Sequence, residues 1–120
     1  MRGARAAGVL LATGVAAAAV IPAASLGASK PVRKTVKVGD DYFGPSKMTV
    51  SKGKTVLWKW LAANGNTHDV KLKKHPKGVK SFHSAPATSG YTYKKTLKVK
   101  GTYKVICTFH EGMTLTITVK

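Results

Sequence analysis

The stretch that decides the fold reads Gly101-Thr102-Tyr103-Lys104-Val105-Ile106-Cys107-Thr108-Phe109-His110-Glu111-Gly112-Met113-Thr114-Leu115-Thr116-Ile117-Thr118-Val119. Both of its ends alternate polar and apolar residues, which predicts half-buried β-strands over 103–107 and 114–119. The connection between these strands carries a thiol, an imidazole and a thioether, from Cys107, His110 and Met113. The stretch therefore predicts two adjacent strands whose joining loop offers three soft or borderline metal ligands.

The same alternation recurs upstream of this stretch. It covers residues 35–38, 47–51, 55–60, 68–73 and 91–99. Turn signals rich in Gly, Asn, Pro and Ser separate these segments. Residues 75–89 are the least regular part, and there we expect a long surface connection with a short strand near 80–82. About seven to eight short strands at near-regular spacing indicate an all-β domain, a β-sandwich.

The N-terminal segment has the composition of a secretory signal peptide. Two arginines, Arg2 and Arg5, precede an apolar run from Val9 to Ile21, and small residues follow. The run is shorter than the roughly 20 residues that a membrane span needs. We expect a signal peptide at residues 1–29, a single domain at 30–120, and export to the periplasm, the cell surface or the medium. An uncleaved N-terminal anchor is the alternative.

The charge of the chain is strongly one-sided. Lys and Arg number 21 against four acidic residues, a formal net charge of +17. Such a field favours acidic partners and anionic surfaces. We expect an acidic redox protein as partner and an anionic cell surface as a second contact. Nucleic acid is not expected, because the tyrosines fit the strand pattern better than a base-stacking surface and because the chain carries an export signal.

The single cysteine points to a metal site. Cys107 can form no internal disulfide, and an unpaired thiol in an exported chain is reactive, paired between chains or occupied. Two imidazoles and a thiolate in a plane, with a weak axial methionine, hold copper in blue electron-transfer sites. The second imidazole would come from His68, which follows a Gly-Asn turn and begins the alternating segment 68–73. The sequence thus predicts one copper ion on His68, Cys107, His110 and Met113.

Other readings of these side chains stay open. Met113 begins an alternating segment and could be a core residue. His75 and His83 are expected to be solvated loop residues. Trp58 and Trp60 lie on one face of a strand and are expected to pack in the core.

The chain resembles the cupredoxins, most closely their plastocyanin and amicyanin branch. The resemblance rests on Phe43-Gly44-Pro45, Gly53-Lys54-Thr55-Val56-Leu57-Trp58, His68-Asp69-Val70 and the spacing of Cys107, His110 and Met113. It implies a Greek-key β-sandwich and an electron carrier with one type 1 copper ion. We expect a monomer, and no enzyme, because the chain has no His-x-His motif of the kind that multicopper oxidases use. The resemblance also implies that His110 is the ligand nearest the surface, beside Phe109 or Pro45.

Two positions depart from that resemblance. Asp69 stands where the family often has Asn, and we expect it to accept a hydrogen bond from Thr108 and to lower the reduction potential. Phe109 stands where related proteins often carry Pro, which leaves a backbone N–H free. Two rival functions remain at this stage: an exported copper carrier or storage protein, and a basic cell-surface binding domain.

Overall fold

The computed structural model describes residues 33–120. The predicted signal peptide at 1–29 and the first residues of the predicted domain lie outside the described residues. Within the described part the chain forms only strands: β1 (Arg33–Gly39), β2 (Tyr42–Gly44), β3 (Lys47–Val50), β4 (Lys54–Trp60), β5 (Lys71–Lys74), β6 (Thr92–Leu97), β7 (Gly101–Ile106) and β8 (Thr114–Val119). In this part of the chain no helix is long and apolar enough to cross a membrane.

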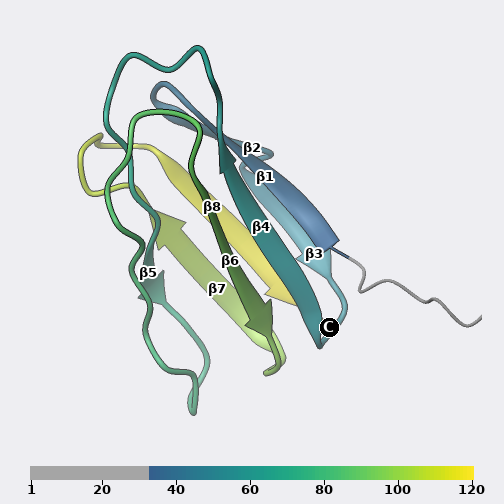
Figure 1. Ribbon diagram of the computed structural model, residues 1–120. Coiled ribbons are helices and arrows are strands. Elements are labelled where there is room, and N and C mark those ends of the chain that lie inside the picture. The colour runs from purple at the N-terminus through teal and green to yellow at the C-terminus, as the bar shows by residue number, and fades with distance from the viewer. Residues whose placement is uncertain (1–32) are drawn as a thin grey trace, which may run out of the picture. The chain divides into compact units, whose positions relative to one another are not determined.

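The strands form two four-stranded sheets (Figure 1). One sheet has the order β2-β1-β4-β6 and the other β3-β8-β7-β5. β1 pairs with β4, and β3 with β8, in parallel, while the remaining pairs are antiparallel. The predicted all-β sandwich is therefore confirmed.

The core lies between the two sheets. Its side chains come from the inward positions of the alternating segments, as the burial of every second residue along β8 shows. Trp58 and Trp60 are fully buried there, at 0% and 1% exposure, which confirms their expected role in packing. Burial of side chains of this kind contributes about 1.5–3 kcal/mol each to folding. The core fixes the strands from whose ends the functional loops extend.

The structure differs from the sequence prediction in three segments. β2 was not expected as a strand. β5 begins at Lys71 rather than at position 68, because His68 instead makes a single bridge with Ala87. The strand expected at 80–82 is wrong: that segment meets β5 through one isolated bridge, from Lys71 to His83. The chain there bonds partly through a side chain, since Val70 N–H donates to Ser84 Oγ, and Pro86 offers no N–H.

Strand directions define two ends of the sandwich. β1 ends at Gly39 and β4 at Trp60, and their parallel register places both at one end, called here the site end. β7 ends at Ile106 at the same end, because Cys107, which follows it, lies beside His68, which follows β4. The loops 40–41, 61–70, 84–91 and 107–113 lie there. The loops 51–53, 75–80 and 98–100 lie at the opposite end, called here the far end. The C-terminus lies at the far end as well (Figure 1).

Candidate metal centre

Three of the four predicted ligands converge at the site end. The donor atoms of His68, Cys107 and His110 all lie within 4.8 Å of one another. The Cys107 Sγ atom lies 3.7 Å from His110 Nδ1. His68 and Cys107 are buried, whereas the His110 side chain is 26% exposed. A single ion can bridge donors this close, and one of the three side chains reaches the surface.

His68 reaches the site from the loop between β4 and β5. Its backbone N–H and C=O pair with Ala87, at 2.9 and 3.0 Å, and its C=O also accepts the indole N–H of Trp60 at 3.2 Å. The ring packs 4.8 Å from that of His110, measured between centroids. Backbone pairing on one side and the tryptophan on the other therefore hold this imidazole in place.

The two nitrogens of His68 have different surroundings. Nε2 lies 2.9 Å from Asp40 Oδ1. Nδ1 is buried and has no hydrogen-bond partner. Because a carboxylate only accepts, Nε2 carries the hydrogen and donates a hydrogen bond to Asp40. The other nitrogen, Nδ1, then has a free lone pair. Among the described residues only this atom and Trp58 Nε1 are buried side-chain N or O atoms without a partner. Unlike the indole N–H, an imidazole lone pair can bind a metal ion, and an ion here would satisfy it.

His110 has a looser contact with a carboxylate. Its Nε2 lies 3.2 Å from Asp41 Oδ1, and its Nδ1 is the atom that faces Cys107. Asp40 and Asp41 form the turn between β1 and β2, where Asp41 has a φ of 68°. Aspartate tolerates this left-handed conformation better than most residues do. One turn thus supplies a carboxylate to each histidine.

The loop from Cys107 to Met113 is closed by its own backbone. Cys107 N–H donates to Met113 C=O at 3.0 Å, and Met113 N–H to His110 C=O at 3.3 Å. Gly112 has a φ of +83°, which favours glycine at this position. Met113 is 1% exposed. The loop therefore fixes the cysteine and histidine donors and leads through a buried methionine into β8.

Asp69 ties this loop to the His68 loop, as expected from the sequence. Thr108 donates to it twice, from its backbone N–H to Oδ1 at 2.7 Å and from its hydroxyl to Oδ2 at 2.6 Å. His83 Nε2 lies 2.7 Å from the same Oδ2. Burial is the largest influence and raises the pKa of Asp69, but the bonds from His83 and Thr108 together outweigh it and lower that pKa below its usual value. The carboxylate is thus ionised and fully bonded.

Asp40 also holds the loop that carries His68. The backbone N–H groups of Gly65 and Asn66 donate to its two oxygens at 2.9 and 3.0 Å. The bond from Gly65, and after it the bond from His68, lower the pKa of Asp40. The carboxylate therefore stays charged while it positions both the loop and the imidazole.

The structure also shows contacts that the sequence did not predict. The contacts of Asp40 and Asp41 with the histidines were missed, although these are two of only four acidic residues in a very basic chain. That rarity was the available signal. His83 is exposed, as expected, but its bond to Asp69 was not. His75 is an exposed far-end residue whose Nδ1 contacts Pro76 C=O.

The donor set fits copper. It combines a buried thiol, an imidazole with an unpartnered Nδ1 and a partly exposed second imidazole, the ligand types of blue-copper sites. A family model described as copper-binding proteins of the plastocyanin/azurin family matches residues 31–120. A search of curated protein sequences gave no match.

Solved structures with the same fold include several copper proteins. A reduced amicyanin variant is 24% identical, with 72% of this chain and 80% of that chain covered and a TM-score of 0.62. A purple cupredoxin from Nitrosopumilus maritimus is 20% identical, with 72% and 98% covered and a TM-score of 0.60. A copper-containing nitrite reductase from Thermus scotoductus SA-01 is 24% identical, with 78% of this chain but 23% of that chain covered, at 0.65. At these identities the likeness shows the fold.

Proposed function

The chain belongs to the plastocyanin/azurin family of copper-binding proteins, and from that premise we propose that it carries single electrons between redox partners outside the cytoplasm. In this proposal it works as a monomer, exported by its N-terminal segment. One type 1 copper ion is held by His68, Cys107 and His110, with Met113 as the weak axial ligand. The chemistry that copper supplies there is a reversible one-electron couple.

One observation carries the proposal. His68 Nδ1, which is buried and unpartnered, belongs to a cluster with a buried thiol and with a second imidazole that reaches the surface. A purely structural histidine would use both nitrogens in hydrogen bonds. Cys107 as a simple core residue would need neither imidazole beside it.

The chain keeps these donors in one arrangement. Asp40 fixes the proton on His68 Nε2, and Asp69 fastens the ligand loop through Thr108. Backbone bonds close the loop at Met113. A site held this firmly changes little when its charge changes, which is what fast electron transfer requires.

His110 is the port for the electron in this proposal. Its side chain is 26% exposed, whereas that of His68 is fully buried. Phe109, at 52% exposure, lies beside it in the loop, and Tyr42, at 46%, follows Asp41. These two aromatic side chains would form the apolar contact with a partner.

We propose an acidic redox protein as that partner. Lys59 precedes Trp60, whose indole bonds to His68, and Lys71 pairs with Ile106, the residue before Cys107. These lysines lie on the strands next to the site loops and would attract acidic groups at the sides of the site end, while the loops themselves, which carry the acidic residues of the chain, would contact the partner through Phe109 and Tyr42. Electron-transfer rates should then fall as ionic strength rises. A rate that is constant or rises with salt would rule out an acidic partner.

The chain is proposed to have no catalytic activity of its own. It contains no His-x-His motif of the kind that multicopper oxidases use. The nitrite reductase of similar fold is a much longer protein, of which this chain covers 23%. Its activity therefore gives no expectation for this chain.

Voltammetry of the copper-loaded chain tests the electron-carrier proposal. We expect one reversible one-electron wave, with Cys107→Ser as the control that loses it. In parallel, a Cu(I) chelator of moderate affinity should remove copper slowly. Rapid loss of copper to the chelator, with no reversible wave, would instead identify a carrier or storage protein.

A further inference from the structure

The charges of the domain are separated between its two ends. All four acidic residues of the chain lie at the site end, namely Asp40, Asp41, Asp69 and Glu111. The segments that surround the metal centre there, residues 40–46, 61–70, 83–92 and 107–116, contain no Lys or Arg. The loops of the site end therefore carry all the acidic residues of a basic domain, and lysines such as Lys59 and Lys71 lie on the adjoining strands.

The far end of the described domain has the opposite character. It contains no acidic residue. Its strand termini and loops carry Arg33, Lys34, Lys52, Lys54, Lys74, Lys77, Lys80, Lys98, Lys100 and Lys120. The like charges here repel one another with no acidic side chain nearby, which destabilises the free domain. Such a surface is explained by an anionic partner.

Two loops of the far end lie side by side and have the same pattern. Each places a valine next to lysines, in 77–80 around Val79 and in 98–100 around Val99. The two loops are adjacent at their bases. Gly101 directly follows one loop and Pro76 directly precedes the other, and a Cβ on Gly101 would lie 2.5 Å from Pro76 Cγ. Val99 is 36% exposed, and the other large exposed apolar side chains of the described domain, Tyr42 and Phe109, belong to the site end.

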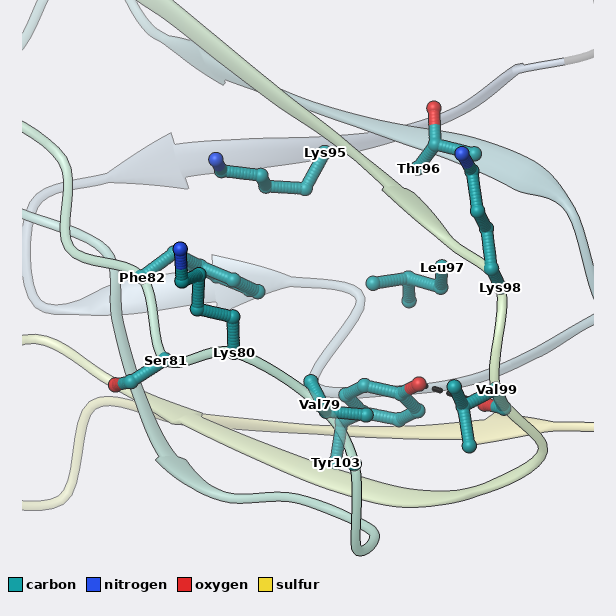
Figure 2. A pocket seen from close by; sticks show the side chains of 11 residues that line it. Val79, Lys80, Ser81, Phe82, Lys95, Thr96, Leu97, Lys98, Val99 and Tyr103 are labelled. Carbon is teal, nitrogen blue, oxygen red and sulfur yellow. Dashed lines mark hydrogen bonds between the residues drawn. The ribbon is translucent and has the colours of Figure 1, made fainter.

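These loops border a cleft of about 360 Å³. Leu97, Phe82 and Tyr103 give it an apolar floor, and Figure 2 shows the amino groups of Lys80, Lys95 and Lys98 spread above it. Tyr103 hydroxyl donates to Val99 C=O at 2.6 Å, so the floor is joined to the loop beside it. Amino groups around an apolar floor are complementary to a molecule that has an anionic head group and a hydrocarbon chain.

The chain also enters the domain at this end. β1 begins at Arg33, opposite Thr55 near the start of β4. The predicted export segment, with its apolar run from Val9 to Ile21, precedes Arg33 in the sequence. During export, the part of the domain nearest the membrane along the chain is therefore its far end.

From these observations we propose that the far end docks on the anionic phospholipid surface of a bilayer. The lysines lie at the level of the headgroups, and Val79 and Val99 enter the interface. The site end then points away from the membrane and is open to redox partners. Lysines alone would suffice for a water-soluble polyanion, whereas the exposed valine and the apolar cleft favour lipid. Docking needs no copper, and only its benefit to electron transfer rests on the proposed function.

Vesicle sedimentation tests the docking. The chain as recovered after export, in its copper-free Cys107→Ser form, is mixed with vesicles of phosphatidylcholine alone or with phosphatidylglycerol. The readout is the ratio of the two partition coefficients, so that any uncleaved apolar segment contributes equally to both. We expect clear preference for the anionic vesicles, weakened by salt. Equal partition into both kinds of vesicle would overturn the proposal.

Two variants of equal net charge locate the surface. One carries Lys77→Gln, Lys80→Gln, Lys98→Gln and Lys100→Gln, and its matched control carries Lys37→Gln, Lys47→Gln, Lys94→Gln and Lys104→Gln on the sheet faces. All of these side chains are exposed, so both variants should fold. The far-end variant should lose about a hundredfold or more in anionic-vesicle binding and the control less than about tenfold. Equal losses would reduce the effect to net charge and overturn the proposal.

Val99→Ser separates lipid from other anions. The substitution should weaken vesicle binding about fivefold and leave binding to polyglutamate unchanged. If vesicle binding does not change, the far end is a polyanion site and the lipid assignment is wrong. Because every arm uses copper-free protein, failure here leaves the electron-carrier proposal intact, and failure of that proposal leaves docking intact.

Discussion

The two ends of the sandwich are built on the same strands but differ in how their polar side chains are bonded. At the site end, Asp40 and Asp69 make directed bonds to a histidine, to Thr108 and to loop backbone. At the far end, backbone bonds such as Lys52 N–H to Lys120 C=O close the loops, and the lysines extend into solvent. Holding one ion requires fixed donor positions, whereas attraction to an anionic surface requires only the sign and density of charge.

The largest expected difference between the ends is their response to copper. Adding Cu(II) should raise the unfolding midpoint strongly, since free copper at a thousand times the dissociation constant stabilises the fold by about 4 kcal/mol. Cys107→Ser should abolish the rise, and far-end Lys98→Gln should preserve it. Thermal unfolding with and without copper makes the measurement. An unmoved wild-type midpoint would mean that the site end holds no metal.

Removing Asp69 should be the next largest effect. In copper-free protein, Asp69→Ala leaves Thr108 and His83 without their partner and should lower the free energy of unfolding by about 1–3 kcal/mol. Asp69→Asn keeps an acceptor oxygen for Thr108 and should cost less. Urea unfolding gives both values. Equal stability of the wild type and both variants would show that the two ligand loops are not held together by this carboxylate.

Asp40 should act on the metal affinity. Asp40→Ala removes the carboxylate that keeps the hydrogen of His68 on Nε2 and that accepts the N–H groups of Gly65 and Asn66. Copper affinity should therefore fall about 10- to 100-fold. Asp41→Asn is the matched control, because Asp41 is 64% exposed and its contact with His110 is longer. Competition with a chelator measures both affinities. If the control loses as much as Asp40→Ala, surface charge rather than positioning is responsible.

The smallest expected effect lies at the far end. Tyr103→Phe removes the bond to Val99 C=O and should lower the free energy of unfolding by about 0.5–1.5 kcal/mol. Copper affinity should not change, because sites this separate behave additively. A clear change in copper affinity would show that the two ends are coupled.

Most of the strands, and the proximity of Cys107 to His110, were predictable because their signals are local. Alternation over β4, β7 and β8 requires only neighbouring residues, and Cys107, His110 and Met113 share one loop. The carboxylate that orients His68 comes from distant sequence: Asp40 and His68 are 28 positions apart. Which acid meets which imidazole depends on the pairing of β1 with β4, which composition does not reveal. The separation of charge between the ends likewise appears only once strand directions are known.

The failed strand prediction at 80–82 has a related cause. The alternating segment there is short. The backbone N–H of Val70, just before β5, bonds to the side chain of Ser84 and not to a backbone carbonyl, so regular strand pairing does not extend there. His68 lies outside the strand predicted for it because its backbone pairs with Ala87 in an isolated bridge. Both differences arise where the chain turns from regular pairing to positioning the metal centre.

The visible absorption spectrum of the copper-loaded chain tests the central claim most directly. If Cys107 and both imidazoles hold one copper ion, the spectrum contains an intense thiolate-to-copper charge-transfer band, and Cys107→Ser abolishes that band. A wild-type chain that takes up Cu(II) but shows only the weak absorption of imidazole-bound copper would contradict the account.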